Sequence, residues 1–62
     1  MMRLYEAAAY YTKHGEADFI VSPEYIFSEN ETDAEHKFVI EYAEVLSNYR
    51  IEEVTILVRP FA

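Results

Sequence analysis

Two histidines and three serines are the residues of this chain that could take part in nucleophilic or acid–base chemistry. His14 precedes the only glycine, Gly15, and His36 lies 22 positions after His14. A nucleophile triad needs a serine beside a histidine that a carboxylate holds in place, but no serine stands in a recognisable setting: Ser22, Ser28 and Ser47. A zinc site needs at least three ligands, and the chain has no cysteine. We therefore expect no catalytic residue, no metal and no cofactor, and predict that the protein is not an enzyme.

Acidic residues are the other candidates, because carboxylates bind metal ions and basic partners. Five of them occur with no basic residue between them: Glu24, Glu29, Glu31, Asp33 and Glu35. The alternation of Glu29, Glu31 and Asp33 is similar to calcium-ligand spacing, but the glycine and the final glutamate of an EF-hand loop are missing. Asp33 and Glu35 are explained by the start of a helix, where negative charge is favourable. The other acids predict a surface of one sign, formed by Glu24, Glu29, Glu31, Glu41, Glu44, Glu52 and Glu53.

Composition indicates one small folded domain that spans residues 1–62. Half of the residues are apolar (52%), and 12 acidic residues outweigh five basic ones to give a formal charge of −7. A chain of this size buries only about 60% of the surface that its unfolded form exposes. It has no disulfide to support it, and natural chains of this length often gain stability by association. The charge disfavours direct binding to nucleic acid or to anionic membranes. The start of the chain has no apolar leader, so we expect a cytoplasmic protein, in the host cytoplasm if it is viral.

Three segments have the residue pattern of strands. Arg3–Thr12 and residues 17–28 flank Lys13-His14-Gly15-Glu16, a short loop with glycine where a positive φ is needed, which predicts a hairpin. Pro23 cannot donate to a strand ladder, so the second strand should lie at an edge or carry a bulge. Ile51–Phe61 is predicted to form the last strand.

A helix is predicted between the second and third strands. Thr32 and Glu35 have the spacing of a capping box, and apolar residues then recur at helical spacing up to Tyr49. Asn48 is suited to a left-handed cap that ends the helix near Ser47. Ile40 falls on the polar side of this helix.

The element order β-β-α-β predicts an α+β fold. We expect a three-stranded antiparallel sheet in the order 2-1-3, with the helix packed on one face. This order places the alanine-rich first strand beneath the helix, where small side chains allow close approach, and leaves Pro23 on an edge.

One helix covers only one face of such a sheet, so large residues should remain on the other face. These are Tyr5 and Tyr11, or Leu4 and Tyr10, together with Leu57 and Phe61 or their alternates. Such a patch is typical of an interface. We predict a partner-binding surface that consists of Tyr5, Tyr11, Glu24, Glu29, Glu31, Ile40, Glu41, Glu44, Glu52 and Glu53.

These features favour a small acidic protein-binding module whose partner is a basic protein. Tyrosine anchors with a charged rim suit protein recognition. In composition alone the chain resembles small acidic virus-encoded inhibitors, which implies a nucleic acid mimic that occupies a nucleic-acid-binding partner. The alternative is a structural homo-oligomer, with a dimer favoured, or an assembly subunit that uses the uncovered sheet face. A second alternative is a small oligomeric enzyme with His14 or His36 at the subunit boundary.

Overall fold

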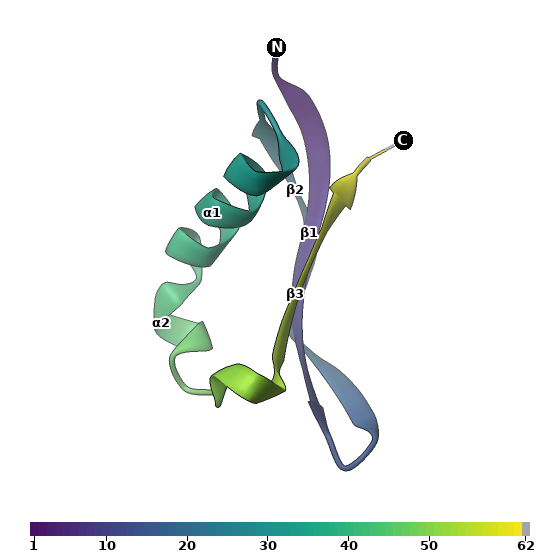
Figure 1. Cartoon of the computed structure of the whole chain (residues 1–62), viewed down its shortest axis with the longest axis vertical. Coiled ribbons are helices and arrows are strands. Elements are labelled where there is room, and N and C mark those ends of the chain that lie inside the picture. The colour runs from purple at the N-terminus through teal and green to yellow at the C-terminus, as the bar shows by residue number, and fades with distance from the viewer. Residues whose placement is uncertain (62) are drawn as a thin grey trace.

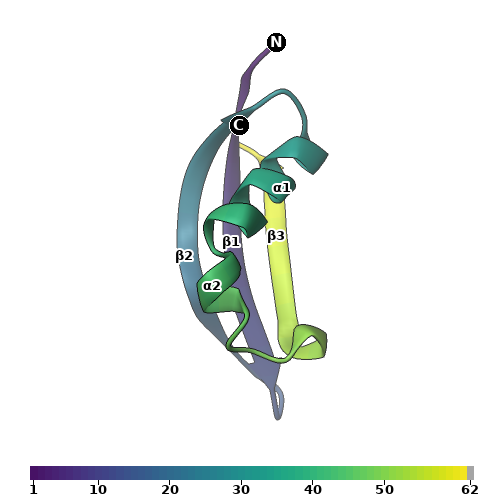
Figure 2. The ribbon, with the colours of Figure 1, turned by 90° about the vertical axis from the view of Figure 1, so that its left-hand side faces the viewer.

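The computed structural model describes residues 1–61 and shows a sheet with helices on one side. Strands β1 (Arg3–Lys13) and β2 (Glu16–Ser28) precede α1 (Glu31–Glu41) and α2 (Ala43–Leu46), and a 3₁₀ turn, η1 (Ile51–Glu53), leads into β3 (Val54–Pro60). The strand order is β2-β1-β3, and β1 pairs antiparallel with both neighbours. The helices run along one face of the sheet (Figures 1 and 2). The predicted α+β class, the 2-1-3 order and the single covered face are confirmed.

The β1–β2 hairpin has the tight turn that the glycine predicts. Lys13 pairs with Glu16, so the loop contains only His14 and Gly15. Their φ angles are 55° and 80°, and a two-residue turn with both φ values positive matches the right-handed twist of the strands. Histidine is among the residues that tolerate this conformation.

Strand β2 lies at an edge and is irregular around Pro23. The register shifts between the pairs Ala7↔Glu24 and Ala9↔Val21, and again before Tyr10↔Phe19. At each shift β2 contains one residue more than β1, which is the signature of a bulge. Pro23 is therefore tolerated, as the sequence predicts.

The core lies between the helices and the central strand. Ala7 and Ala9 of β1 and Phe38 of α1 are completely buried and contact one another. Small side chains on β1 allow α1 to approach the sheet closely, so that the Phe38 ring fills the space between them. The surrounding apolar residues are only partly buried: Ile20, Val21, Ile26, Tyr42, Leu46, Ile56 and Val58.

The helix begins two residues earlier than predicted. Asn30 is the N-cap, and its side-chain Oδ1 accepts a hydrogen bond of 2.8 Å from the Asp33 N–H. Thr32 lies inside the first turn, so the predicted capping box is wrong. Asparagine caps a helix as well as threonine does. The Asn30 cap is supported by a hydrogen bond from the buried Ser28 hydroxyl to Asp33.

The end of the helix also differs from the prediction. The helix is interrupted at Tyr42 (φ −108°, ψ 18°) and α2 ends with Ser47 as its C-cap. The helix thus ends near Ser47 as expected. Asn48 does not have the positive φ of a left-handed cap, so that detail is wrong. The last strand begins at Val54 rather than Ile51, because the preceding three residues form η1.

No helix within residues 1–61 combines the length and the apolar character that crossing a membrane requires.

Candidate protein-interaction surface

The sheet face that the helices leave uncovered carries most of the exposed aromatic residues. Side chains alternate along β1, so Leu4, Glu6, Ala8 and Tyr10 point away from the core residues Ala7 and Ala9. Cross-strand partners share a face, and the pairing therefore adds residues of β2 and β3. We call this surface the open face; its large apolar members are Leu4, Tyr10, Phe19, Tyr25, Phe27, Leu57 and Phe61.

Five members of the open face have between 45% and 63% of their surface in water: Phe19, Tyr25, Phe27, Leu57 and Phe61. Four aromatic rings of the open face form two edge-on pairs. The Tyr10 and Phe19 centroids are 6.3 Å apart, and those of Tyr25 and Phe61 are 4.7 Å apart. A shallow hollow of about 240 Å³ lies against Tyr10, Phe19 and Leu57. The open face therefore carries two aromatic pairs and a shallow hollow.

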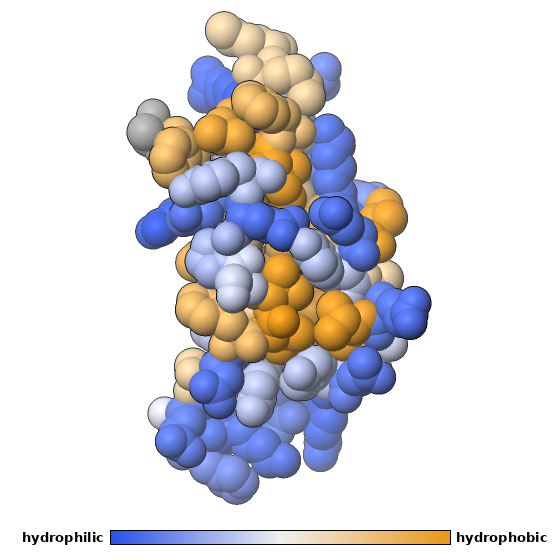
Figure 3. All heavy atoms as spheres, turned by 180° about the vertical axis from the view of Figure 1, so that it is seen from behind, coloured by the Kyte–Doolittle hydropathy of each residue, from blue (hydrophilic) through white to orange (hydrophobic). Residues whose placement is uncertain are grey.

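Seen from behind the view of Figure 1, apolar side chains gather in patches over the middle of the molecule, with hydrophilic atoms between them (Figure 3). Hydrophilic side chains cover the end at which the β1–β2 turn lies. In this view the apolar patches therefore lie over the body of the molecule and not over the hairpin turn.

One ion pair interrupts the open face. The Arg59 side chain donates to Glu6 Oε1 through Nε at 2.9 Å and lies 2.8 Å from it through a terminal nitrogen. The two residues are also direct strand partners. The pair cancels its own charge, so the open face is close to neutral although the protein is strongly acidic.

Two of the predicted partner-binding tyrosines lie on the opposite, helix-covered face. Tyr5 is 5% exposed, and Tyr11 packs against Tyr49 with centroids 5.4 Å apart. The negative charge of Asp18 raises the pKa of the Tyr11 hydroxyl. The expected set is therefore corrected: of the two alternatives, Leu4 and Tyr10 lie on the open face.

Glu24 is another predicted binding residue that is already engaged. It is half-buried and accepts a hydrogen bond from the Tyr42 hydroxyl. This bond, with the carboxylate charge and partial burial, raises the pKa of Tyr42 to about 12. Glu24 therefore joins β2 to the helical layer, on the side of the sheet opposite the open face.

The other predicted acids lie in the loops and helices beside the sheet and not on the open face. Glu53 is half-buried and the rest are exposed: Glu29, Glu31, Glu41, Glu44 and Glu52. Glu52 pairs with Arg50 at 2.7 Å. The expectation that acidic and apolar surface form one interface is wrong, because the helical layer that carries most of these acids is separated from the open face by the sheet.

Lys37 and Ile40 are exposed residues of α1. Lys37 lies 3.4 Å from Asp33 and donates to the Phe27 carbonyl at 3.1 Å. The Ser28 hydroxyl, and then Lys37, hold the pKa of Asp33 below its usual value. Ile40 is 65% exposed, on the polar side as predicted, but remote from the open face.

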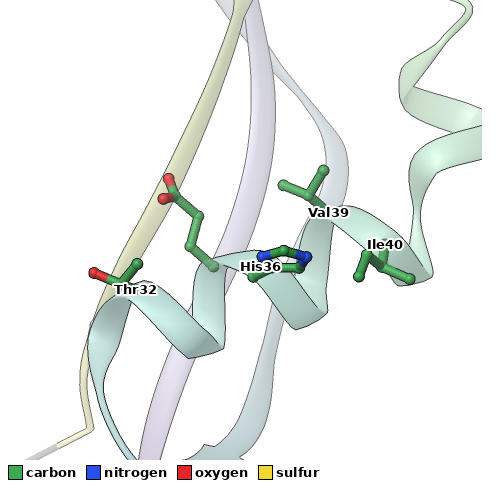
Figure 4. A pocket seen from close by; sticks show the side chains of 5 residues that line it. Thr32, His36, Val39 and Ile40 are labelled. Carbon is green, nitrogen blue, oxygen red and sulfur yellow. The ribbon is translucent and has the colours of Figure 1, made fainter.

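The two histidines lie on different elements. His14 is in the hairpin turn, whereas His36 lines a hollow of about 270 Å³. Every residue of that hollow comes from α1: Thr32, Glu35, His36, Val39 and Ile40 (Figure 4). It is a groove along one helix and offers no enclosure from water. Within residues 1–61, no three histidine or carboxylate residues are grouped to hold a metal ion.

Sequence reasoning missed Phe19, Tyr25 and Phe27 as site residues. The bulges of β2 change which of its residues share a face with Tyr10. Pro23 indicates that a bulge can occur in β2, but it does not predict which residues then face outward.

No family model matches the chain, and comparisons with curated proteins and with solved structures find no significant match. The function is therefore argued from the surface alone.

Proposed function

We propose that the protein is a non-enzymatic protein-binding module that docks through its open face. One observation carries this proposal. The helices cover one face of the sheet, whereas the aromatic residues of the open face remain exposed to water. In a domain of this size, large apolar groups stabilise the fold when they are buried. Their placement on an uncovered face favours burial against another protein.

The extent of the open face suits a small interface. An aromatic side chain has roughly 200 Å² of surface, so its four half-exposed aromatic residues leave on the order of 400 Å² in water. Patches of this size on monomers often mark interaction sites. The other residues of the open face add to this exposed area and bring it closer to the roughly 800 Å² that each partner buries in a standard interface.

The neutral character of the open face favours an apolar partner surface over a basic one. Glu6 and Arg59 stand beside each other, so a second copy could exchange these partners across a two-fold axis. A homodimer is thus the first occupant to test. The predicted nucleic acid mimic would have to use the helical side instead, where unpaired acids lie, and remains a prediction.

The test compares the wild type with the double variant Phe19→Ser/Phe27→Ser. Ile40→Ser is the matched control, because Ile40 is as exposed but lies on α1. Sedimentation at micromolar concentrations measures self-association, and affinity capture measures other partners, with folding checked by circular dichroism. We expect the double variant to lose the dimer or the captured partner, and the control to keep it. A double variant that behaves like the wild type in both assays refutes the proposal.

A further inference from the structure

The two edges of the sheet differ in their ability to accept another strand. β2 carries Pro23 and two bulges, which are common devices against edge pairing. β3 has no bulge, and its one proline, Pro60, is the last residue of the strand. Its register with β1 runs without a shift from Tyr11↔Val54 to Tyr5↔Pro60. The outer edge of β3 is therefore a regular template for strand addition.

The hydrogen-bonding pattern shows which groups of β3 point outward. The Phe61 N–H donates to the Leu4 carbonyl at 3.0 Å, so these residues form a hydrogen-bonded pair. In an antiparallel ladder such pairs alternate with pairs whose main-chain groups point away from each other. Outward groups therefore belong to alternate residues of β3: Val54, Ile56, Val58 and Pro60.

Two of these residues keep a free N–H. The Val54 N–H already donates to the Ile51 carbonyl, and proline has none. Within residues 1–61, β3 pairs only with β1. Ile56 and Val58 therefore offer two donors and two acceptors to an added strand.

The first turns of α1 overhang this part of the edge. A groove of about 260 Å³ lies between Glu31, Thr32 and Glu35 on one side and Ile56–Val58 on the other. Figure 2 shows the start of α1 reaching across β3. Neither glutamate has a basic partner within residues 1–61. Two uncompensated carboxylates thus stand beside the free main-chain groups.

We propose that the β3 edge binds an extended segment of a partner protein as a fourth strand, and that this segment alternates basic and apolar residues. The main chain of Ile56 and Val58 would hold the segment, as in other cases of strand addition. Its basic side chains would face Glu31 and Glu35. Its apolar side chains would lie on the other side, beside Leu57, and extend the open face.

A second copy of this chain fits the edge less well. The helical side of β3 presents Val54, Ile56 and Val58, which bring no positive charge to the groove. Edge-to-edge pairing of two copies would also bring both pairs of glutamates toward the same junction. Repulsion between these like charges would destabilise the pairing of two copies. The carboxylates therefore select a basic strand and oppose self-pairing.

The probes are blocked peptides of about seven residues, the length of β3. The first alternates lysine and valine, the second alternates glutamate and valine, and the third replaces each valine of the first by proline. The third keeps the charge but cannot form a regular ladder. Calorimetry measures affinity, and NMR follows the amide shifts and hydrogen exchange of Ile56 and Val58 in the full chain.

We expect only the lysine–valine peptide to bind and to slow exchange at Ile56 and Val58, with weaker binding as salt is raised. Glu31→Gln/Glu35→Gln should weaken binding about fivefold, as expected for the loss of two exposed ion pairs. Glu41→Gln/Glu44→Gln removes the same charge away from the groove and is the control.

Three results would overturn the proposal. The first is equal binding of the lysine and glutamate peptides, and the second is an equal effect of the two double variants. The third is slow exchange at Ile56 and Val58 in the protein alone that disappears on dilution, since a second copy then occupies the edge. The open face is untouched by these variants, so either proposal can fail without the other.

Discussion

Replacing Phe38 by alanine should unfold most of the protein. Phe38 is the largest side chain that is completely buried, and its ring packs on Ala7, Ala9 and, at 5.0 Å between centroids, Tyr42. Loss of a fully buried aromatic side chain costs about 4 kcal/mol at roughly 25 cal/mol per Å² for on the order of 150 Å². Measured Phe→Ala changes in cores, about 3–5 kcal/mol, include the cavity that remains.

This cost is comparable to the whole stability of the domain. At roughly 0.05–0.15 kcal/mol per residue, a chain of 62 residues has about 3–9 kcal/mol of folding free energy. The alanines beneath Phe38 are too small to close the cavity. A variant with little or no folded population at room temperature is therefore the expected result.

Urea unfolding followed by circular dichroism tests this prediction, with Phe27→Ala as the matched control. Phe27 is 63% exposed on the open face, so its loss should cost much less, about 1 kcal/mol or below. Phe38→Leu should retain the fold with reduced stability. If Phe38→Ala costs no more than Phe27→Ala, the core does not lie between α1 and β1, and the assignment of the open face fails with it.

Three further predictions concern the helix start and the titrating groups. Asn30→Ala should lower the free energy of unfolding by about 1 kcal/mol, and Thr32→Ala by clearly less, because Asn30 is the N-cap; equal losses in urea unfolding would restore the capping box. Tyr42 has a raised pKa of about 12, so stability should fall as pH rises from about 10 to about 12; Tyr42→Phe should remove this fall and one late-titrating tyrosine from the ultraviolet absorbance titration. The pKa of Asp33 is lowered, so its stabilisation is present above about pH 4 and is lost as pH falls further; Ser28→Ala should raise that pKa in a carboxyl NMR titration, and an unchanged value would contradict the hydrogen bond.

Charge and apolar surface are separated in this molecule. The acids stand mainly on the helical layer and its connections, whereas the open face carries aromatic rings and one balanced ion pair. The acidic side chains favour solubility and repel acidic partners. The open face carries almost no net charge, so this repulsion does not prevent it from associating.

The capping error shows the limit of a local motif. Two neighbouring segments could each start the helix, one from Asn30 and one from Thr32. The start at Asn30 is favoured by the hydrogen bond that Ser28, the last residue of β2, donates to Asp33 in the first turn of α1. A motif confined to the helix could not predict it, because β2 had first to be placed.

The order of the elements, the tight turn at Gly15 and the edge position of the strand with Pro23 could all be predicted from the residues alone. These features depend on the backbone preferences of individual residues, which can be recognised in a short segment of sequence. The face of β1 that the helices cover could not be predicted in this way and is known from the packing. Alanines occupy both faces at Ala7, Ala8 and Ala9, and tyrosines occupy both as well, so the alternation of β1 distinguishes neither side. Phe38 packs over Ala7 and Ala9, and this choice depends on the fit of side chains from several elements, which the alternation of one strand does not contain.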